Sequence, residues 1–279
     1  MQTVKQLKDL ISLKYAIWKR DCTEYLQRYR GFYEADWKDK PRVIYMTGMP
    51  RTGSSLMKNY LGSYPGMKIM PFQKEGFHKT YALARNNNDS ILIDKSTSYI
   101  EHPDYLFDAY GKQVSLFCIV RDPRDQYLSL LSFKGHIGQP RNTRFWHFWH
   151  DRYRNLLSYI EERPDLKIAL LRYEDLVRAP IDAKSFFVSW AGLKSTSELI
   201  SKTYKVAYQD DIQDSKVALA NTPIETSIGK HLKISDPSLS ATINYYKEHK
   251  KIRDLMKLFG YSDRTEPPAL RREVNIFRT

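Results

Sequence analysis

The chain has few cysteines and no long hydrophobic run among its 279 residues. Its two cysteines, Cys22 and Cys118, exclude a framework of several disulfides. No apolar run reaches the roughly 20 residues of a membrane span, and residues 1–21 lack the apolar stretch of a signal peptide. No cluster of cysteine and histidine has the spacing of metal ligands. We therefore expect a cytoplasmic protein with no stable membrane insertion and no metal.

Acidic residues are scarce relative to basic ones. Lys and Arg total 45, Asp and Glu total 32, and the formal net charge is +13. A basic balance suits several kinds of anionic partner, including nucleotides, nucleic acids and anionic membranes. The basic residues are spread along the chain, and no aromatic stacking motif for RNA or single strands is visible. We therefore expect a small-molecule partner and no nucleic acid, while the oligomeric state stays open.

Hydrophobic residues make up 42% of the chain, which is enough for a core of ordinary size. A chain of this length forms one large α/β domain or two small ones, and no change of composition marks a second domain. We predict an N-terminal helix and lead-in at 1–41, one domain at 42–262, and a C-terminal tail at 263–279.

Residues 43–60 have the pattern of a phosphate-binding segment. An apolar run at 43–46 predicts a buried strand, Gly48 and Gly53 bracket a turn, and a helical pattern begins at Ser54. We expect Ser54 or Ser55 to cap this helix. A strand, a glycine loop and a helix N-terminus together favour an anion, because free N–H groups and the helix dipole point at it.

The loop departs from that of nucleoside triphosphatases. Gly48 and Gly53 have the spacing of a P-loop, but Gly53 is followed by Ser54 and not by the usual lysine. The cation lies inside the loop, at Arg51. This arrangement suits a phosphate that carries a transferable group without Mg²⁺. A plain turn, a P-loop kinase or nucleoside triphosphatase, and a basic binding module remain alternatives.

The string Pro-Arg-Thr-Gly-Ser-Ser at 50–55 resembles the 5′-phosphosulfate loop of sulfotransferases that use 3′-phosphoadenosine 5′-phosphosulfate (PAPS). The arginine in it is similar to that of the bacterial and Golgi-type members. The resemblance implies PAPS as the donor and 3′-phosphoadenosine 5′-phosphate (PAP) as its product. It also implies a set of cofactor-binding residues in this loop: Arg51, Thr52, Gly53, Ser54 and Ser55.

A second match lies after the apolar run 114–120. Asp122 is placed to cap a helix that Pro123 begins. The spacing from Arg121 to Ser129 resembles the site at which sulfotransferases hold the nucleotide's 3′-phosphate, and the planar fork of arginine suits phosphate oxygens. Near the C-terminus, a further string resembles the family's last nucleotide loop and implies three more cofactor-binding residues: Ser227, Gly229 and Lys230.

The candidate catalytic residues Glu75 and Lys95 each follow a short predicted strand. Lys95 lies in a stretch that resembles the one whose lysine contacts the transferring sulfonate in heparan-type sulfotransferases. Animal cytosolic members have a histidine base two residues after this lysine, where this chain has Thr97. The segment around Glu75 resembles the one that holds the catalytic glutamate of heparan-type members. Glu75 is therefore our candidate for the general base. The predicted catalytic residues are Glu75, Arg51 and Lys95. Composition alone favours a solvated loop for Glu75, and two histidines are the next candidates: His78 and His136.

The strand pattern predicts an α/β fold with one parallel sheet flanked by helices, similar to P-loop nucleotide-binding folds. The predicted strands end at Met46, Ile93, Val120 and Leu171. Three of these strands are followed by polar candidates: Arg51, Lys95 and Arg121. Ligands of open parallel sheets bind at the carboxyl ends of the strands, so these residues lie where a site is expected. We also predict helices at 144–162 and 180–191, and one long amphipathic helix at 236–258 that Gly260 ends.

These patterns together predict an enzyme that moves a sulfonate group from PAPS to a hydroxyl or amine of a small molecule by in-line displacement. A bacterial natural product is the acceptor we expect, with a guanidinium alkaloid of the saxitoxin type as one conceivable example. The alternatives are a carbohydrate sulfotransferase and a P-loop kinase or nucleoside triphosphatase.

Overall fold

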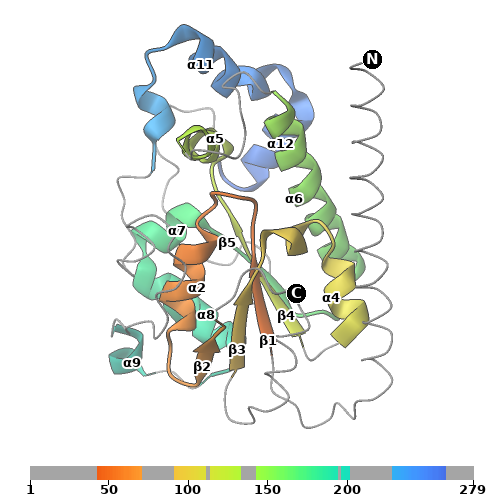
Figure 1. Ribbon diagram of the computed structural model, residues 1–279, viewed down its shortest axis with the longest axis vertical. Helices are drawn as coiled ribbons and strands as arrows, with labels where there is room; N and C mark the ends of the chain where they lie inside the picture. Colours follow the sequence, from red (N-terminus) through yellow and green to blue (C-terminus); the bar gives the residue numbers. More distant parts are fainter. Residues whose placement is uncertain are drawn as a thin grey trace, which may run out of the picture.

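The fold is organised around a five-stranded sheet with the strand order β2-β3-β1-β4-β5, and every pair of neighbours is parallel (Figure 1). The computed structural model describes residues 43–70, 91–110, 114–132, 143–193, 196–201 and 228–261. The strands are β1 (Val43–Thr47), β2 (Met67–Ile69), β3 (Ile91–Lys95), β4 (Val114–Val120) and β5 (Ile168–Arg172). This parallel α/β sheet confirms the fold class predicted from the sequence.

The central strands are buried on both faces, which explains why they are continuous apolar runs. Along β1, Val43 and Tyr45 join one hydrophobic cluster, while Ile44 and Met46 join another on the opposite face. In β4, Phe117 packs edge-on against Phe187, with ring centroids 4.8 Å apart. The sheet is therefore the middle of three layers.

Helices cover both faces of the sheet (Figure 1). One face packs against α2 (Ser54–Gly62), α7 (Tyr173–Arg178) and α8 (Pro180–Ala191). The other face packs against α4 (Pro103–Tyr110), α5 (Pro123–Leu131), α6 (Arg144–Glu162) and α12 (Lys250–Leu258). The shorter helical elements are η1 (Thr97–Ile100), α9 (Ser197–Ser201), η4 (Lys230–Lys233), α11 (Pro237–Ile243) and η5 (Asn244–Glu248). None of the helices in these ranges is long and apolar enough to cross a membrane.

The long helix predicted at 236–258 is wrong, because the structure divides it into α11, η5 and α12. Asn244 ends α11, and both its backbone N–H and its side-chain amide donate to the carbonyl of Ser240. His249 is extended and separates η5 from α12. The end of α12 is as predicted, with Gly260 in the left-handed region and its N–H bonded to the carbonyl of Lys257.

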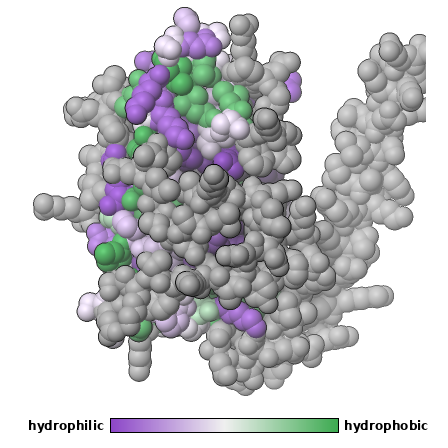
Figure 2. Space-filling model, turned by 60° about the vertical axis from the view of Figure 1, so that its left-hand side comes forward, coloured by the Kyte–Doolittle hydropathy of each residue, from purple (hydrophilic) through white to green (hydrophobic). Residues whose placement is uncertain are grey.

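The strand order places a switch point between β1 and β4. The chain runs from β1 toward β2 and β3 on one side, and from β4 toward β5 on the other. Ligands of open α/β sheets bind in the crevice that this divergence creates at the carboxyl ends of the strands. These ends point toward the part of the molecule that carries α5 and α11 (Figure 1). At that end, Figure 2 shows hydrophobic surface gathered between streaks of hydrophilic surface.

Candidate active site

The loop between β1 and α2 is held in a tight turn. The N–H and the hydroxyl of Thr52 both donate to the carbonyl of Met49, at 3.2 and 2.7 Å. A Cβ on Gly48 would lie 2.6 Å from the carbonyl oxygen of Ile119, so only glycine fits beside β4. Thr52, which we predicted to bind the cofactor, has a buried side chain that forms a hydrogen bond within the loop. Thr52 therefore shapes this loop.

No side chain caps the N-terminus of α2 in the described part of the chain. Gly53 is the N-cap residue, with φ of 94°, so the prediction that Ser54 or Ser55 caps this helix is wrong. The first helical N–H groups, which a capping side chain would otherwise engage, lie at the carboxyl end of β1. This helix N-terminus has the properties of an anion site.

Arg51 and the segment after β4 are in direct contact. The Nη1 of Arg121 donates to the carbonyl oxygen of Arg51 at 3.0 Å, and the Nε of Arg51 donates to the hydroxyl of Ser129 at 3.2 Å. The side-chain amide of Gln126 donates to the carbonyl of Pro50 at 2.8 Å. Arg51, Arg121 and Ser129, predicted from separate motifs, therefore lie together at the switch point.

Lys95 approaches the same loop from β3. It is the last residue of that strand, and its Nζ donates to the hydroxyl of Ser55 at 2.7 Å. Strand β3 is held in register beside β1, and the hydroxyl of Thr47 donates to the carbonyl of Ser96 at 2.7 Å. The structure thus brings a second cation to the N-terminus of α2.

One family model matches this chain. A model described as "Sulfotransferase family" matches residues 68–196. These residues make up a little under half of the chain, and over them the chain is similar to the sulfotransferase family. This confirms the family predicted from the sequence and shows that the protein is a sulfotransferase enzyme. No curated protein sequence gives a significant match.

One solved structure supports the fold, and two others were compared with it. The sulfotransferase domain of the Synechococcus PCC 7002 olefin synthase is 16% identical, with a TM-score of 0.53, and the match covers 77% of this chain and 98% of that one. The sulfotransferase domain of the curacin biosynthetic pathway is 18% identical, with a TM-score of 0.47 and coverages of 75% and 98%. Mouse sulfotransferase SULT7A1 complexed with PAP is 16% identical, with a TM-score of 0.46 and coverages of 78% and 82%. The last two scores are too low to support an inference.

The aromatic ring of Tyr173 lies beside Arg121, and the sequence analysis did not identify it as part of the site. The guanidinium of Arg121 lies 4.5 Å from the ring centroid of Tyr173. The same ring would be 2.5 Å from a Cβ at position 53, so Gly53 is required by both its backbone angle and its neighbour. The strand-to-helix step after β5 is the only sequence signal that places Tyr173 at this end of the sheet.

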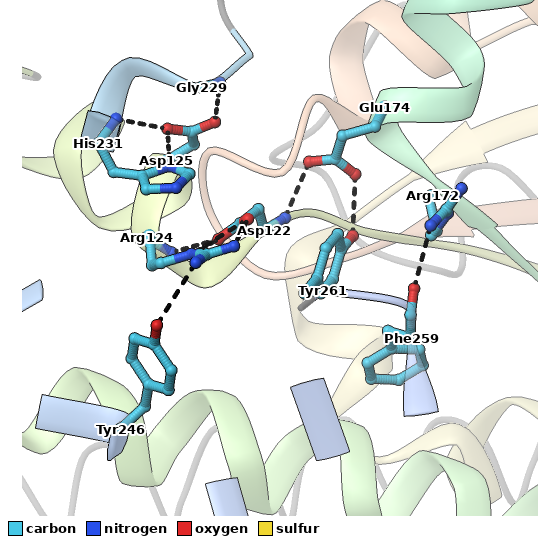
Figure 3. A network of polar contacts seen from close by, with 10 residues as sticks. All are labelled: Asp122, Arg124, Asp125, Arg172, Glu174, Gly229, His231, Tyr246, Phe259 and Tyr261. Carbon is cyan, nitrogen blue, oxygen red and sulfur yellow. Dashed lines mark hydrogen bonds and ion pairs between the residues drawn. The ribbon is translucent and has the colours of Figure 1, made fainter. Parts of the chain in front are cut away.

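A buried polar network joins the segment after β4 to the C-terminal segment (Figure 3). Asp122 caps α5 by accepting from the N–H of Arg124, and it also pairs with the Arg124 guanidinium at 2.6 Å. This confirms the predicted cap. Burial lowers the pKa of Arg124, but the charge and hydrogen bond of Asp122 outweigh burial and raise it above its ordinary value. The Arg124 guanidinium therefore stays charged.

Glu174 is a carboxyl group of this network with a raised pKa. It accepts from the N–H of Asp122 and from the hydroxyl of Tyr261, both at 2.9 Å (Figure 3). Burial, and then the negative charge of Asp122, raise the pKa of Glu174 to about 7. Glu174 thus changes its charge near neutral pH, and it does so within the buried network beside the site.

The remaining predicted residues are divided between described and undescribed parts of the chain. Gly229 is the N-cap of η4, and its N–H donates to Asp125 at 2.6 Å. Lys230 follows it with an exposed side chain. Four others lie outside the described residues: Glu75, His78, His136 and Ser227. Within the described residues, no group of three or more His, Cys, Asp and Glu side chains has an arrangement that holds a metal ion.

Proposed function

We propose that this sulfotransferase takes its sulfonate from PAPS and transfers it to a hydroxyl or amine of a small molecule, with PAP as the second product. The observation that carries the proposal is the contact between the loops after β1 and β4, made by Arg51, Arg121 and Ser129. A nucleotide with anionic groups at both its 5′ and 3′ positions requires cations from two such segments.

The loop after β1 is assigned to the 5′-phosphosulfate. The N-terminus of α2, with Gly53, Ser54 and Ser55, supplies backbone N–H groups, and Arg51 and Lys95 supply positive charge. The donor, when bound, supplies a sulfonate on a phosphate leaving group. Fixed cations and N–H donors stabilise the charge that develops on the sulfonate and on the bridging oxygen. Arg51 and Lys95 are therefore the residues that we expect to accelerate transfer.

The segment after β4 is assigned to the 3′-phosphate. Arg121 is buried beside Tyr173 and already engages the loop after β1, so its guanidinium has a fixed position. Ser129 lies on the first helix after this strand, within reach of Arg51. Three residues of the C-terminal loop complete the nucleotide site in our proposal: Ser227, Gly229 and Lys230.

Glu75 is our candidate for the general base that takes the acceptor's proton. General-base catalysis typically contributes about 10²–10⁴ in rate. Glu75→Gln keeps the shape of the side chain but does not accept a proton at neutral pH, so turnover is expected to fall by that factor while PAP affinity stays unchanged. Near-normal turnover of Glu75→Gln on the true acceptor would exclude it and leave His78 and His136 to be tested.

Small-molecule hydroxyls and amines are the acceptor class we propose, with a bacterial natural product as the leading candidate. A screen of metabolites with PAPS, read by the mass of sulfonated products, identifies the acceptor. The protein is assigned no nucleic-acid partner. Sulfonation of polysaccharides in that screen, with no small molecule accepted, would favour the carbohydrate sulfotransferase alternative.

Nucleotide binding gives a direct test of the donor. We expect calorimetry to show PAP binding at least about tenfold more tightly than adenosine 5′-phosphate, because one charge-assisted hydrogen bond contributes roughly 1.5–3 kcal/mol. Arg121→Ala and Ser129→Ala are expected to weaken the binding of PAP more than that of adenosine 5′-phosphate. Tighter binding of ATP with Mg²⁺ than of PAP would contradict the proposal and favour a kinase or nucleoside triphosphatase.

A further inference from the structure

One buried carboxylate in the first turn of α5 binds three donors of the C-terminal segment. Asp125 accepts from the N–H of Gly229 at 2.6 Å, from the N–H of His231 at 2.9 Å and from the Nδ1 of His231 at 2.8 Å (Figure 3). Its exposed fraction is 1%. Burial raises the pKa of Asp125, but the hydrogen bond and charge of His231 outweigh burial and hold it below its ordinary value. The side chain is therefore an ionised carboxylate engaged by a segment distant in sequence.

These contacts determine the backbone of the loop that begins η4. Gly229 has φ of 71°, and the N–H groups of residues 229 and 231 point at the same carboxylate. Successive N–H groups that converge on an anion in this way form a nest. Lys230 lies between the two bound residues and is exposed, so the carboxylate fixes its backbone and leaves its side chain outside.

Asp125 and Ser129 belong to the same helix and are one helical turn apart. Ser129 accepts from Arg51 in the loop after β1, and Gln126, the residue after Asp125, donates to the carbonyl of Pro50 in that loop. Helix α5 thus holds the loop after β1 with one set of side chains and the C-terminal loop with another. The relative position of the two loops depends on this helix.

We propose that Asp125 is a positioning residue for nucleotide binding, which holds Gly229 and Lys230 at the site without touching the nucleotide itself. This inference rests on the proposed function. Its alternative is a purely structural role, in which the carboxylate stabilises the fold but the C-terminal loop binds no nucleotide. The positioning role and the structural role differ in one measurable respect. Only the positioning role predicts that a folded variant of Asp125 has a lower affinity for PAP.

The test compares Asp125→Asn with Asp182→Asn. Both aspartates are the third residue of a helix that begins with proline, α5 at Pro123 and α8 at Pro180, so the loss of charge near a helix N-terminus is matched. Asp182 is exposed. In Asp125→Asn, the amide accepts at one oxygen and presents N–H groups to the other donors. We expect the Kd for PAP and the KM for PAPS to rise at least about tenfold, with kcat at saturating PAPS within about threefold of wild type. Asp182→Asn is expected to leave all three unchanged.

Two further variants identify the route of the effect. Lys230→Ala is expected to weaken PAP binding, and the double variant Asp125→Asn with Lys230→Ala is expected to be no weaker than the worse single variant, because both changes remove the same contact. His231→Ala removes one of the three donors and is expected to raise the Kd for PAP by a smaller factor, which keeps the test available if Asp125→Asn does not fold.

The outcomes separate the inference from the proposed function. Wild-type protein that binds no PAP overturns the proposed function and this inference with it. Wild-type protein that binds PAP, with folded Asp125→Asn or His231→Ala that binds it equally well, overturns the inference alone. Additive losses in the double variant also overturn it, because Asp125 then does not act through Lys230.

Discussion

At the scale of single residues, the backbone of Arg51 is the least ordinary feature of the site. Its φ is 68°, and it is the only residue other than glycine with a positive φ in the described ranges. Residues with a Cβ avoid this region, at a cost of about 1–2 kcal/mol. The surroundings hold the strain, since Arg121 binds the carbonyl of Arg51 and Ser129 binds its Nε. The side chain is thereby directed to the switch point.

We expect Arg51→Ala to lower turnover by about 10²–10³, in line with the loss of one preorganised donor to developing charge. The Kd for PAP is expected to change less, because PAP lacks the sulfonate that the side chain is proposed to face. Steady-state kinetics and calorimetry measure the two quantities. Turnover equal to that of wild type would remove Arg51 from the mechanism.

Gly53 allows a comparison between backbone strain and steric contact. Gly53→Ala places a Cβ 2.5 Å from the Tyr173 ring at φ of 94°, whereas Gly66→Ala meets only Leu193 at 3.7 Å, at φ of 84°. Gly66→Ala is expected to lower the free energy of unfolding by about 1–2 kcal/mol, from strain alone. Gly53→Ala is expected to lower it further, by about 1–3 kcal/mol more, because Tyr173 is displaced from Arg121. Urea unfolding measures both, and equal losses would show that Tyr173 moves at no cost.

At the scale of elements, α5 is the helix on which the site depends. Its start is encoded locally, since Asp122 caps it and Pro123 occupies the first position. Its role comes from contacts with distant segments: Gln126 with the loop after β1, and Arg124 with Tyr246, whose hydroxyl lies 3.4 Å from Nη1. The helix therefore connects the loop after β1 to η5.

We expect Asp122→Ala to destabilise the protein by about 3–5 kcal/mol, because it leaves the buried Arg124 without its carboxylate partner. Asp122→Ala combined with Arg124→Met removes the unpaired charge and is expected to recover part of that loss. Chemical denaturation of the three proteins measures the difference. A double variant less stable than Asp122→Ala would show that Arg124 contributes chiefly through contacts other than this pair.

At the scale of the whole molecule, Glu174 joins three parts of the fold: the segment after β4 through Asp122, helix α7 on which it lies, and the segment after α12 through Tyr261. Its pKa is raised by burial and by Asp122 from 4.5 to about 7. The folded protein therefore binds a proton that the unfolded chain releases between these two values.

The sign of the pH effect follows from this difference. Glu174 contributes stability that is fully present below its unfolded pKa of 4.5 and is lost as the pH rises through about 7. The loss is on the order of 3 kcal/mol at most. Glu174→Gln resembles the protonated acid and is expected to remove this fall in the free energy of unfolding between pH 5 and about 7.5. Denaturation at several pH values measures it, and parallel pH dependences of the two proteins would contradict the assignment.

The local patterns of the sequence were sufficient for much of the fold. Continuous apolar runs predicted the parallel strands, because strands buried on both faces have no polar side, and the 3.6-residue pattern predicted α6 with the bounds that the structure has. The order of the strands and glycines also predicted where Arg51, Lys95 and Arg121 meet. The strands and helices depend on residues that are close together in the chain, and the meeting point follows from the shared edge at which parallel strands end.

The sequence by itself therefore determined the fold class, the sulfotransferase family and the position of the cation cluster at the carboxyl ends of the strands. Only the tertiary structure decided that Gly53 caps α2, that Thr52 is used within its loop, and that the C-terminal helix is broken at Asn244. It alone also paired Asp125 with Gly229 and His231. The physical reason for the Asp125 pairing is that its partners are distant in the chain and are brought together by packing, so no periodicity within one segment encodes it. The bonds of Thr52 and Asn244 are local, but the choice between such bonds and the regular helix depends on the tertiary context.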